Sequence, residues 1–200
     1  MKIDKQLLIV FGILIGLLII LIISIPLYSS YKNRDVYFDY NGFEVNTLDG
    51  GFKFKIFINE RQTANYVNFL SDPRVIENIT LSTDVSTLKD VQELFTVITP
   101  AHNLGSEAAV AIFEVEKILD NPALFTVPVT AAFTAPSERI NLTVVTCQDA
   151  TPEKPVMWFK LSDTRMGMFK EQNCYLVEGQ TEKDLIKIAD KIGMTLLGIM

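Results

Sequence analysis

The chain has 200 residues, of which 48% are hydrophobic and 21% are charged, and it contains 10 glycines. This composition is typical of a folded chain and excludes a disordered or collagen-like one. Beyond residue 28 the chain carries 16 lysines and arginines against 23 aspartates and glutamates, a net charge near −7. Nucleic-acid binding depends on Lys and Arg side chains that neutralise phosphates, so we expect no nucleic acid among the partners.

A long uncharged segment lies near the N-terminus. Residues 7–27 read LLIVFGILIGLLIILIISIPL, 21 residues without a charge. A helix of this length spans roughly 30 Å, the thickness of a bilayer core. We therefore expect a short tail over 1–6, a transmembrane anchor over 7–28, a neck over 29–39 and a single extracytoplasmic domain over 40–200. The alternative is a cleaved signal peptide, although residues 24–28 contain no clear small-residue cleavage site.

The charges at the two ends of this segment predict its orientation. Lys2, Lys5 and the α-amino group precede it, whereas Lys32 and Arg34 follow it. The positive-inside rule then predicts a single-pass protein of the cell membrane, with the N-terminus inside and the C-terminal domain outside. The lipid bilayer is thus an expected partner.

Two glycines inside the expected anchor form a GxxxG pattern. Gly12 and Gly16 would share one helix face, where small residues let a second helix approach closely. The pattern predicts a helix-dimer face, and hence a second copy or another membrane or envelope protein as partner. The alternative is a chance occurrence in a helix rich in Ile, Leu and Gly.

The next part of the chain alternates between apolar and polar residues, as half-buried strands do. Residues 43–46 and 52–58 predict two strands, and the glycines of Asp49-Gly50-Gly51 suit the tight turn between them. Residues 66–70 predict a third strand, which ends before the turn signal Ser71-Asp72-Pro73. Residues 76–81 are interpreted as a short connection.

The second half of the chain contains apolar runs and two segments whose apolar residues recur at helical spacing. A helix is expected from Ser106, as N-cap, to about residue 120, with Glu107, Glu114 and Glu116 on its solvated side. A second helix is expected after Thr181, whose spacing to Asp184 resembles a capping box. The residues expected to face the core from the first helix are Ala109, Ile112, Phe113, Val115 and Leu119.

Strands in this half are expected over 94–98, 127–133, 142–146, 156–161 and 174–178, and Pro128 indicates an edge strand or a strand start. The apolar end of the chain, residues 196–200, is expected to dock on the core. The element order predicts an α+β or α/β fold. After the N-terminal transmembrane helix it has one domain, with a β-hairpin or meander and a mixed sheet covered by two helices.

Two cysteines and two sequons bear on the compartment. Cys147 and Cys174 are the only cysteines, so they either form one disulfide in an oxidising compartment or are two buried thiols. We expect the disulfide, because each cysteine lies at the end of an expected strand. Asn78 and Asn141 begin N-x-T sequences that match glycosylation sequons, a pattern that also arises by chance.

Residues that could support catalysis are sparse. His102 is the only histidine and lies with Asn103, Gly105 and Ser106 in a strand-to-helix loop, where backbone N–H groups can meet an anion. The alternative is an ordinary polar loop. Two cysteines separated by 26 residues and one histidine do not make a zinc site, so we expect no metal, cofactor or assigned catalytic residue. The acidic pairs Asp90/Glu93 and Glu114/Glu116 are interpreted as solvated, and Trp158 as a core residue with ligand stacking as its alternative.

Several short motifs together resemble a group of proteins. They are Tyr40-Asn41-Gly42-Phe43, Cys147, Cys174 to Gly179, Ala189-Asp190-Lys191 and the terminal Leu-Leu-Gly-Ile-Met. The pattern resembles uncharacterised single-pass membrane proteins of small-genome archaea. The resemblance implies anchorage and paired cysteines, and it implies no catalytic residue or ligand.

The sequence therefore predicts a membrane-anchored extracytoplasmic interaction or envelope-associated module without evident catalysis. The alternative is a membrane-tethered hydrolase or transferase that uses the loop around His102.

Overall fold

The computed structural model describes residues 36–48, 50–57, 65–100, 104–138 and 140–200, together with positions 15, 16, 18, 20, 22 and 24. These six isolated positions, Gly16 included, are helical. Most of the expected anchor, with Gly12, lies outside the described residues. Within the part of the chain that the structure describes, no helix is long and apolar enough to cross a membrane.

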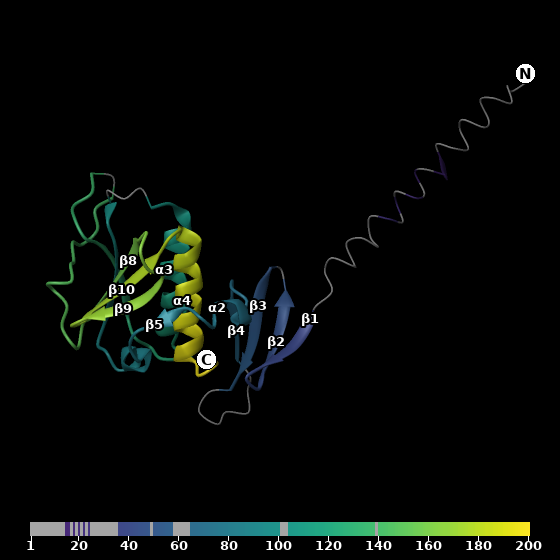
Figure 1. Ribbon diagram of the computed structural model, residues 1–200, viewed down its shortest axis with the longest axis horizontal. Helices are drawn as coiled ribbons and strands as arrows, with labels where there is room; N and C mark the ends of the chain where they lie inside the picture. The colour runs from purple at the N-terminus through teal and green to yellow at the C-terminus, as the bar shows by residue number, and fades with distance from the viewer. Residues whose placement is uncertain are drawn as a thin grey trace, which may run out of the picture.

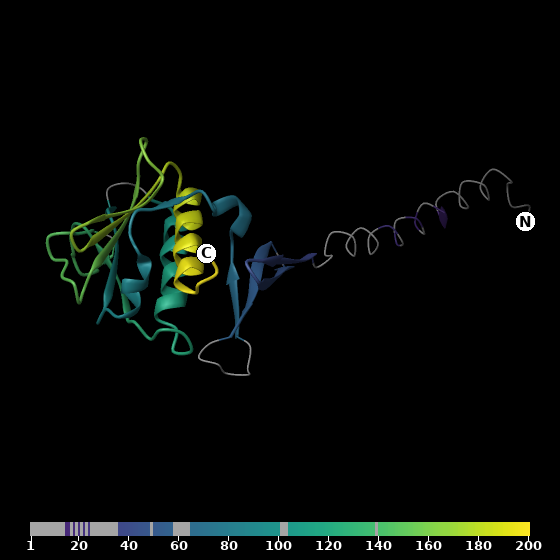
Figure 2. The same ribbon diagram turned by 60° about the horizontal axis from the view of Figure 1, so that its bottom comes forward.

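The fold is α+β, with an antiparallel sheet (sheet A), a mixed sheet (sheet B) and two long helices. Figures 1 and 2 both show the helices between the two sheets. The expected combination of an N-terminal meander, a mixed sheet and two helices is thus confirmed. The structure adds that the meander forms a layer of its own on the far side of the helices.

Sheet A contains four strands in the order β1-β2-β3-β4. The strands expected over 43–46, 52–58 and 66–70 are confirmed as β2, β3 and β4, and Gly50, at a φ of 82°, lies in the turn between β2 and β3. β1 begins inside the segment interpreted as a neck. Asn41 and Gly42, with φ of 51° and 82°, form the tight β1–β2 turn. The bounds are β1 Val36–Tyr40, β2 Phe43–Leu48, β3 Gly51–Ile56 and β4 Asn65–Phe69.

Sheet B contains six strands in the order β5-β9-β10-β8-β6-β7. β7, β6, β8 and β10 run parallel, β9 is antiparallel to β10, and β5 is parallel to β9. The four parallel strands confirm four of the expected ones, and β7 is an edge strand, as Pro128 indicated. The bounds are β5 Thr80–Leu81, β6 Leu94–Ile98, β7 Val129–Phe133, β8 Val156–Leu161, β9 Gly167–Glu171 and β10 Cys174–Gly179.

The strand expected over 142–146 is wrong. That segment contributes only an isolated bridge between Val144 and Phe133 and otherwise crosses the outer face of sheet B. Val145 is buried in the cluster that contains Val97 and Val156, whereas Leu142 and Val144 are 38% and 43% exposed. β5 and β9 were not expected.

Between residues 65 and 200 the described helical elements are the short α2 (Pro73–Ile76), the 3₁₀ helix η1 (Val85–Lys89), α3 (Ser106–Leu119) and α4 (Glu182–Leu196). The capping box at the start of α4 is confirmed, since Thr181 and Asp184 bond to each other's backbone. The N-cap of α3 is Gly105 and not Ser106.

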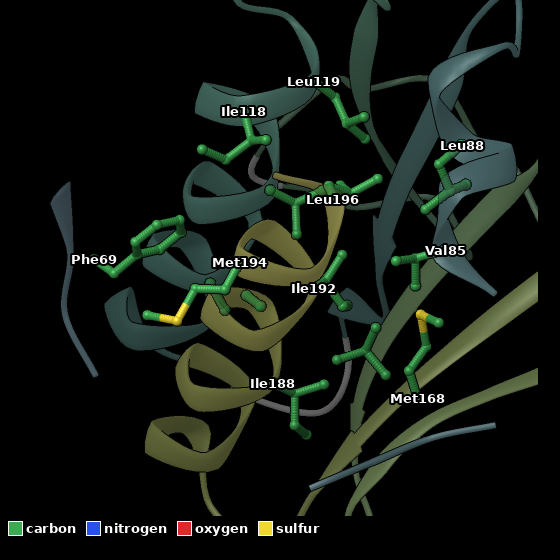
Figure 3. Close-up of a cluster of buried hydrophobic side chains, with 14 of the residues drawn as sticks. Phe69, Val85, Leu88, Ile118, Leu119, Met168, Ile188, Ile192, Met194 and Leu196 are labelled. Atoms are coloured by element: carbon green, nitrogen blue, oxygen red, sulfur yellow. The ribbon is translucent and has the colours of Figure 1, made fainter. Parts of the chain in front are cut away.

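The main core fills the space on both sides of the α3–α4 pair. Figure 3 shows Phe69 of β4 on one side of the helices and Val85, Leu88 and Met168 on the other. α4 approaches β4 closely, because a Cβ at Gly193 would lie 2.8 Å from the ring of Phe69. The C-terminal end docks on this core, as expected, with Leu196 and Ile199 each 1% exposed.

Burial on α3 differs in part from expectation. Val115 and Leu119 face the core, but Ala109 and Phe113 are exposed and Glu114 is only 4% exposed. The helix is sandwiched between two sheets and α4, so its buried surface is wider than a single apolar stripe. Glu114 is consequently inside the protein rather than on a solvated side.

Candidate functional site

The loop before α3 is the first site that the sequence singled out. His102 and Asn103 lie outside the described residues. The N–H groups of Gly105 and Ala108 both donate to the carboxylate of Glu182, over 2.8 and 3.1 Å. A negative side chain of the same chain therefore occupies the start of α3, the position where an external anion would be favoured. Glu182 lies far away in the sequence and was not singled out.

The two cysteines come together on the outer face of sheet B. Cys147 and Cys174 form a disulfide with a Cα–Cα distance of 5.3 Å, so the predicted bridge is present. It ties the segment that covers the sheet to the first residue of β10. The covered face is apolar, since Val97, Val156 and Leu176 are all buried beneath that segment.

The remaining residues considered earlier lie apart from one another. Asn78 and Asn141 are both exposed. Trp158 is half-buried beside the covered face of sheet B, with the Lys160 ammonium 4.8 Å from its ring centroid. Glu93 is held by Lys154 at 3.0 Å, and its hydrogen bonds to Lys154 and Thr130 lower its pKa. None of these residues adjoins another to form a site.

A buried cluster of charged groups joins the helices to sheet A. Asp190 of α4 is fully buried and accepts hydrogen bonds from the backbone of Leu70 and Ser71, at 3.2 and 2.7 Å. Burial, with the adjacent Glu114 carboxyl, raises the pKa of Asp190 to about 8. Lys117 pairs with Glu114 and donates to the carbonyl of residue 68 in β4. Asp190 therefore keeps its proton at neutral pH, and this cluster clamps the end of β4.

A hollow of about 670 Å³ lies where the β1–β2 turn meets α4 and η1. It brings together motifs on which the resemblance rested, since Tyr40, Asn41 and Lys191 all line it. Its polar groups are bonded within the chain. Asn41 donates to the carbonyl of Ile199 at 3.0 Å, and Lys191 donates to that of Glu77. Burial and a hydrogen bond to Glu77 raise the pKa of Tyr40 to about 12. These bonds make the hollow a junction between layers.

The outer face of sheet A differs from all of these places because exposed aromatic rings gather on it. We call the six side chains that line a hollow of about 250 Å³ there the tyrosine face. Tyr37 and Tyr66 are 69% and 60% exposed, and Phe57 beside them is 60% exposed. The members of the tyrosine face are Tyr37, Glu44, Asn46, Lys53, Lys55 and Tyr66.

Strand register explains how these side chains meet. Tyr37, Asn46, Lys53 and Asn68 are cross-strand partners in one row, and Lys55 pairs with Tyr66 in the next. Their neighbours along each strand, such as Val45, Phe54 and Val67, are buried against the helices. Alternation therefore places the whole polar and aromatic set on the side away from the core.

Both tyrosines are held by polar neighbours. Asn46 Nδ2 donates to the Tyr37 hydroxyl at 3.0 Å, and the Lys53 ammonium lies 4.5 Å from the ring centroid of Tyr66. Lys55 pairs with Glu44 at 3.4 Å. These contacts fix the positions of the rings before any ligand arrives, which lowers the entropy cost of binding.

Sequence reasoning assigned these polar positions only to the solvent side of strands. The signal that could have found them is the pair of tyrosines at outward positions, but register was needed to bring them onto one face. Among the described residues, no group of three or more His, Cys, Asp and Glu side chains could hold a metal ion.

No protein-family model, curated protein or solved structure matches this chain. The tyrosine face is therefore the candidate site on its geometry alone, and the resemblance stays a prediction.

Proposed function

We propose that this protein is a membrane-anchored extracytoplasmic binding module whose tyrosine face engages a component of the cell envelope. The observation that carries the proposal is the gathering of exposed, prepositioned aromatic rings on the outer face of sheet A. Aromatic side chains that expose a large flat surface with a polar tip are enriched where proteins bind partners.

Two further features support the placement. The segment over 7–28 has the length and apolarity of a membrane span, and its described residues Ile15, Leu18, Ile20 and Ile22 are each about half to two-thirds exposed. The disulfide supports an oxidising compartment, because reducing cytoplasm keeps most thiols free. β1 begins only a few residues after the proposed anchor, so sheet A is the layer connected directly to the membrane.

The placement is tested on intact cells that express the full chain with a C-terminal tag. A membrane-impermeant protease added to these cells should remove the tag. A cytoplasmic control protein must survive the same treatment. Protection of the tag until the membrane is broken would show that the domain is inside and would end the proposal.

Binding at the tyrosine face is tested by site-specific photo-crosslinking in the native cells. A photoreactive phenylalanine analogue at position 37 or 66 should give a crosslinked product. The same analogue at position 113, an equally exposed aromatic site on α3, is the matched control. Equal crosslinking at all three positions, or none at 37 and 66, would contradict a specific role for this face.

A further inference from the structure

Resting on the proposed function, we infer that the ligand of the tyrosine face is a neutral oligosaccharide. The inference comes from three properties of the face: the spacing of its rings, the balance of its charges and the kinds of polar group between the rings.

The rings lie on opposite edges of the sheet. Tyr37 belongs to β1 and Tyr66 to β4, which are separated by two intervening strands, or about 14 Å at normal strand spacing. This distance suits a short chain of sugar rings better than a single small molecule. The negative face of each aromatic ring attracts the weakly positive C–H groups that sugars present on their flat sides.

The charges on the outer face of sheet A cancel once Asp39, which lies outside the tyrosine face, is counted. Lys53 and Lys55 are balanced by Glu44 and by Asp39, which is the cross-strand partner of Glu44. A polyanion such as a nucleic acid would meet two carboxylates beside the lysines, and a cationic peptide would meet two ammonium groups. A neutral ligand has no such conflict.

The polar groups between the rings match hydroxyl groups, which both donate and accept hydrogen bonds. Lysine ammonium groups donate, carboxylates accept, and the amides of Asn46 and Asn68 do both.

The test uses the full chain in lipid nanodiscs and isothermal titration with neutral hexasaccharides: cellohexaose, maltohexaose, mannohexaose and chitohexaose. Heparin and a single-stranded deoxyoligonucleotide are the polyanionic probes. We expect saturable binding of at least one neutral probe. Tyr37→Ala and Tyr66→Ala should each weaken it by about tenfold, because each removes one of the two rings on which a sugar would stack.

Two further variants separate stacking from folding. Tyr66→Phe keeps the ring and should keep most of the affinity, and Phe113→Ala removes an exposed aromatic elsewhere and should change nothing. Near-ultraviolet circular dichroism checks that every variant is folded. The inference is overturned if no neutral probe binds, if the tyrosine variants bind as well as the parent, or if a polyanion binds this face more tightly.

The crosslinking experiment distinguishes this failure from failure of the proposed function. Crosslinking at positions 37 and 66 that none of the neutral hexasaccharides competes away would leave the binding module standing and remove only the oligosaccharide. Absence of both the crosslinks and the titration signal would remove the two proposals together.

Discussion

The two sheets of this protein share one pair of helices but differ in their outer faces. Sheet B packs against the helices on one side, and a disulfide-linked segment covers the part of its outer face around Val97, Val156 and Leu176 with apolar contacts. Sheet A is buried only on its helix side, and its outer face carries charged side chains and exposed rings. The difference follows the usual behaviour of parallel and antiparallel sheets. This difference agrees with the proposal that sheet A, and not sheet B, carries the binding surface.

The sharpest test of this comparison uses two aromatic residues of one strand. Phe69 of β4 is fully buried, lies 5.7 Å from Phe54 between ring centroids and packs over Gly193. Phe69→Ala should lower the free energy of unfolding by about 4 kcal/mol, the cost of a buried aromatic cavity. Tyr66→Ala, on the exposed side of the same strand, should cost less than about 1 kcal/mol. Urea denaturation measures both, and similar losses would show that the outer face also stabilises the fold.

Removal of the disulfide tests how much the segment on the outer face of sheet B contributes to stability. The double variant Cys147→Ala/Cys174→Ala frees a loop closed by residues 27 apart and should lose about 3.5 kcal/mol in the chain-entropy model. Because the bridge lies on sheet B, any binding at the tyrosine face should survive in the fraction that stays folded. Mass spectrometry after alkylation under non-reducing conditions is the prior check, since two alkylated cysteines in the parent chain would show that no bridge forms.

Features set by residues close together in the sequence could be predicted, whereas features set by contacts between distant residues could not. The capping box of Thr181 and Asp184 and the alternation in β3 are set by neighbours in the chain, and both were readable. The β1–β2 hairpin was readable too, because Asn41-Gly42 is a strong turn signal, but it was missed inside the segment interpreted as a neck.

Other features depend on residues distant in sequence. Glu114 looks solvated on a helical wheel, and its burial follows only from Asp190 on α4 and from the second sheet. The segment over 142–146 has the composition of a strand, yet it makes only an isolated bridge to Phe133 at the edge of sheet B, and of its large apolar side chains only Val145 is buried. The tyrosine face needed the register of all the sheet A strands, which alternation within any one strand does not give.

The junction between sheet A and the helices is expected to respond to pH. The folded state raises the pKa of Asp190 to about 8, so it retains a proton that the unfolded chain releases near pH 4. The stabilisation of the folded state by protonated Asp190 is present in full below about pH 4 and is lost as the pH rises through about 8. Between pH 5 and 8 the free energy of unfolding should fall by up to about 1.4 kcal/mol per pH unit.

Asp190→Asn is the variant that isolates this effect. Its amide oxygen can still accept from Leu70 and Ser71, and its NH₂ group can donate to Glu114 without titrating. The pH dependence between 5 and 8 should flatten, and the variant should match or exceed the parent at pH 8. Asp163→Asn, at an exposed site, is the control and should keep the parent profile. A parent chain equally stable at pH 5 and 8 would contradict a protonated Asp190 in the folded protein.

The smallest expected effect concerns the start of α3, which is the rival candidate site to the tyrosine face. Glu182 accepts from the N–H groups of Gly105 and Ala108, and the N-cap Gly105 supplies no side chain. Glu182→Ala should therefore cost about 1 kcal/mol, the usual loss when a helix N-terminus loses its acceptor. The vacated N–H groups should then respond to added sulfate, so that the melting temperature of the variant rises with sulfate more than with an equal ionic strength of chloride. Glu107→Ala, in the same first turn but without these two bonds, is the matched control. If the melting temperature of the parent chain responds to sulfate as strongly as that of the variant, Glu182 does not occupy the N–H groups at the start of α3. The loop before α3 is then again a candidate anion site, beside the tyrosine face.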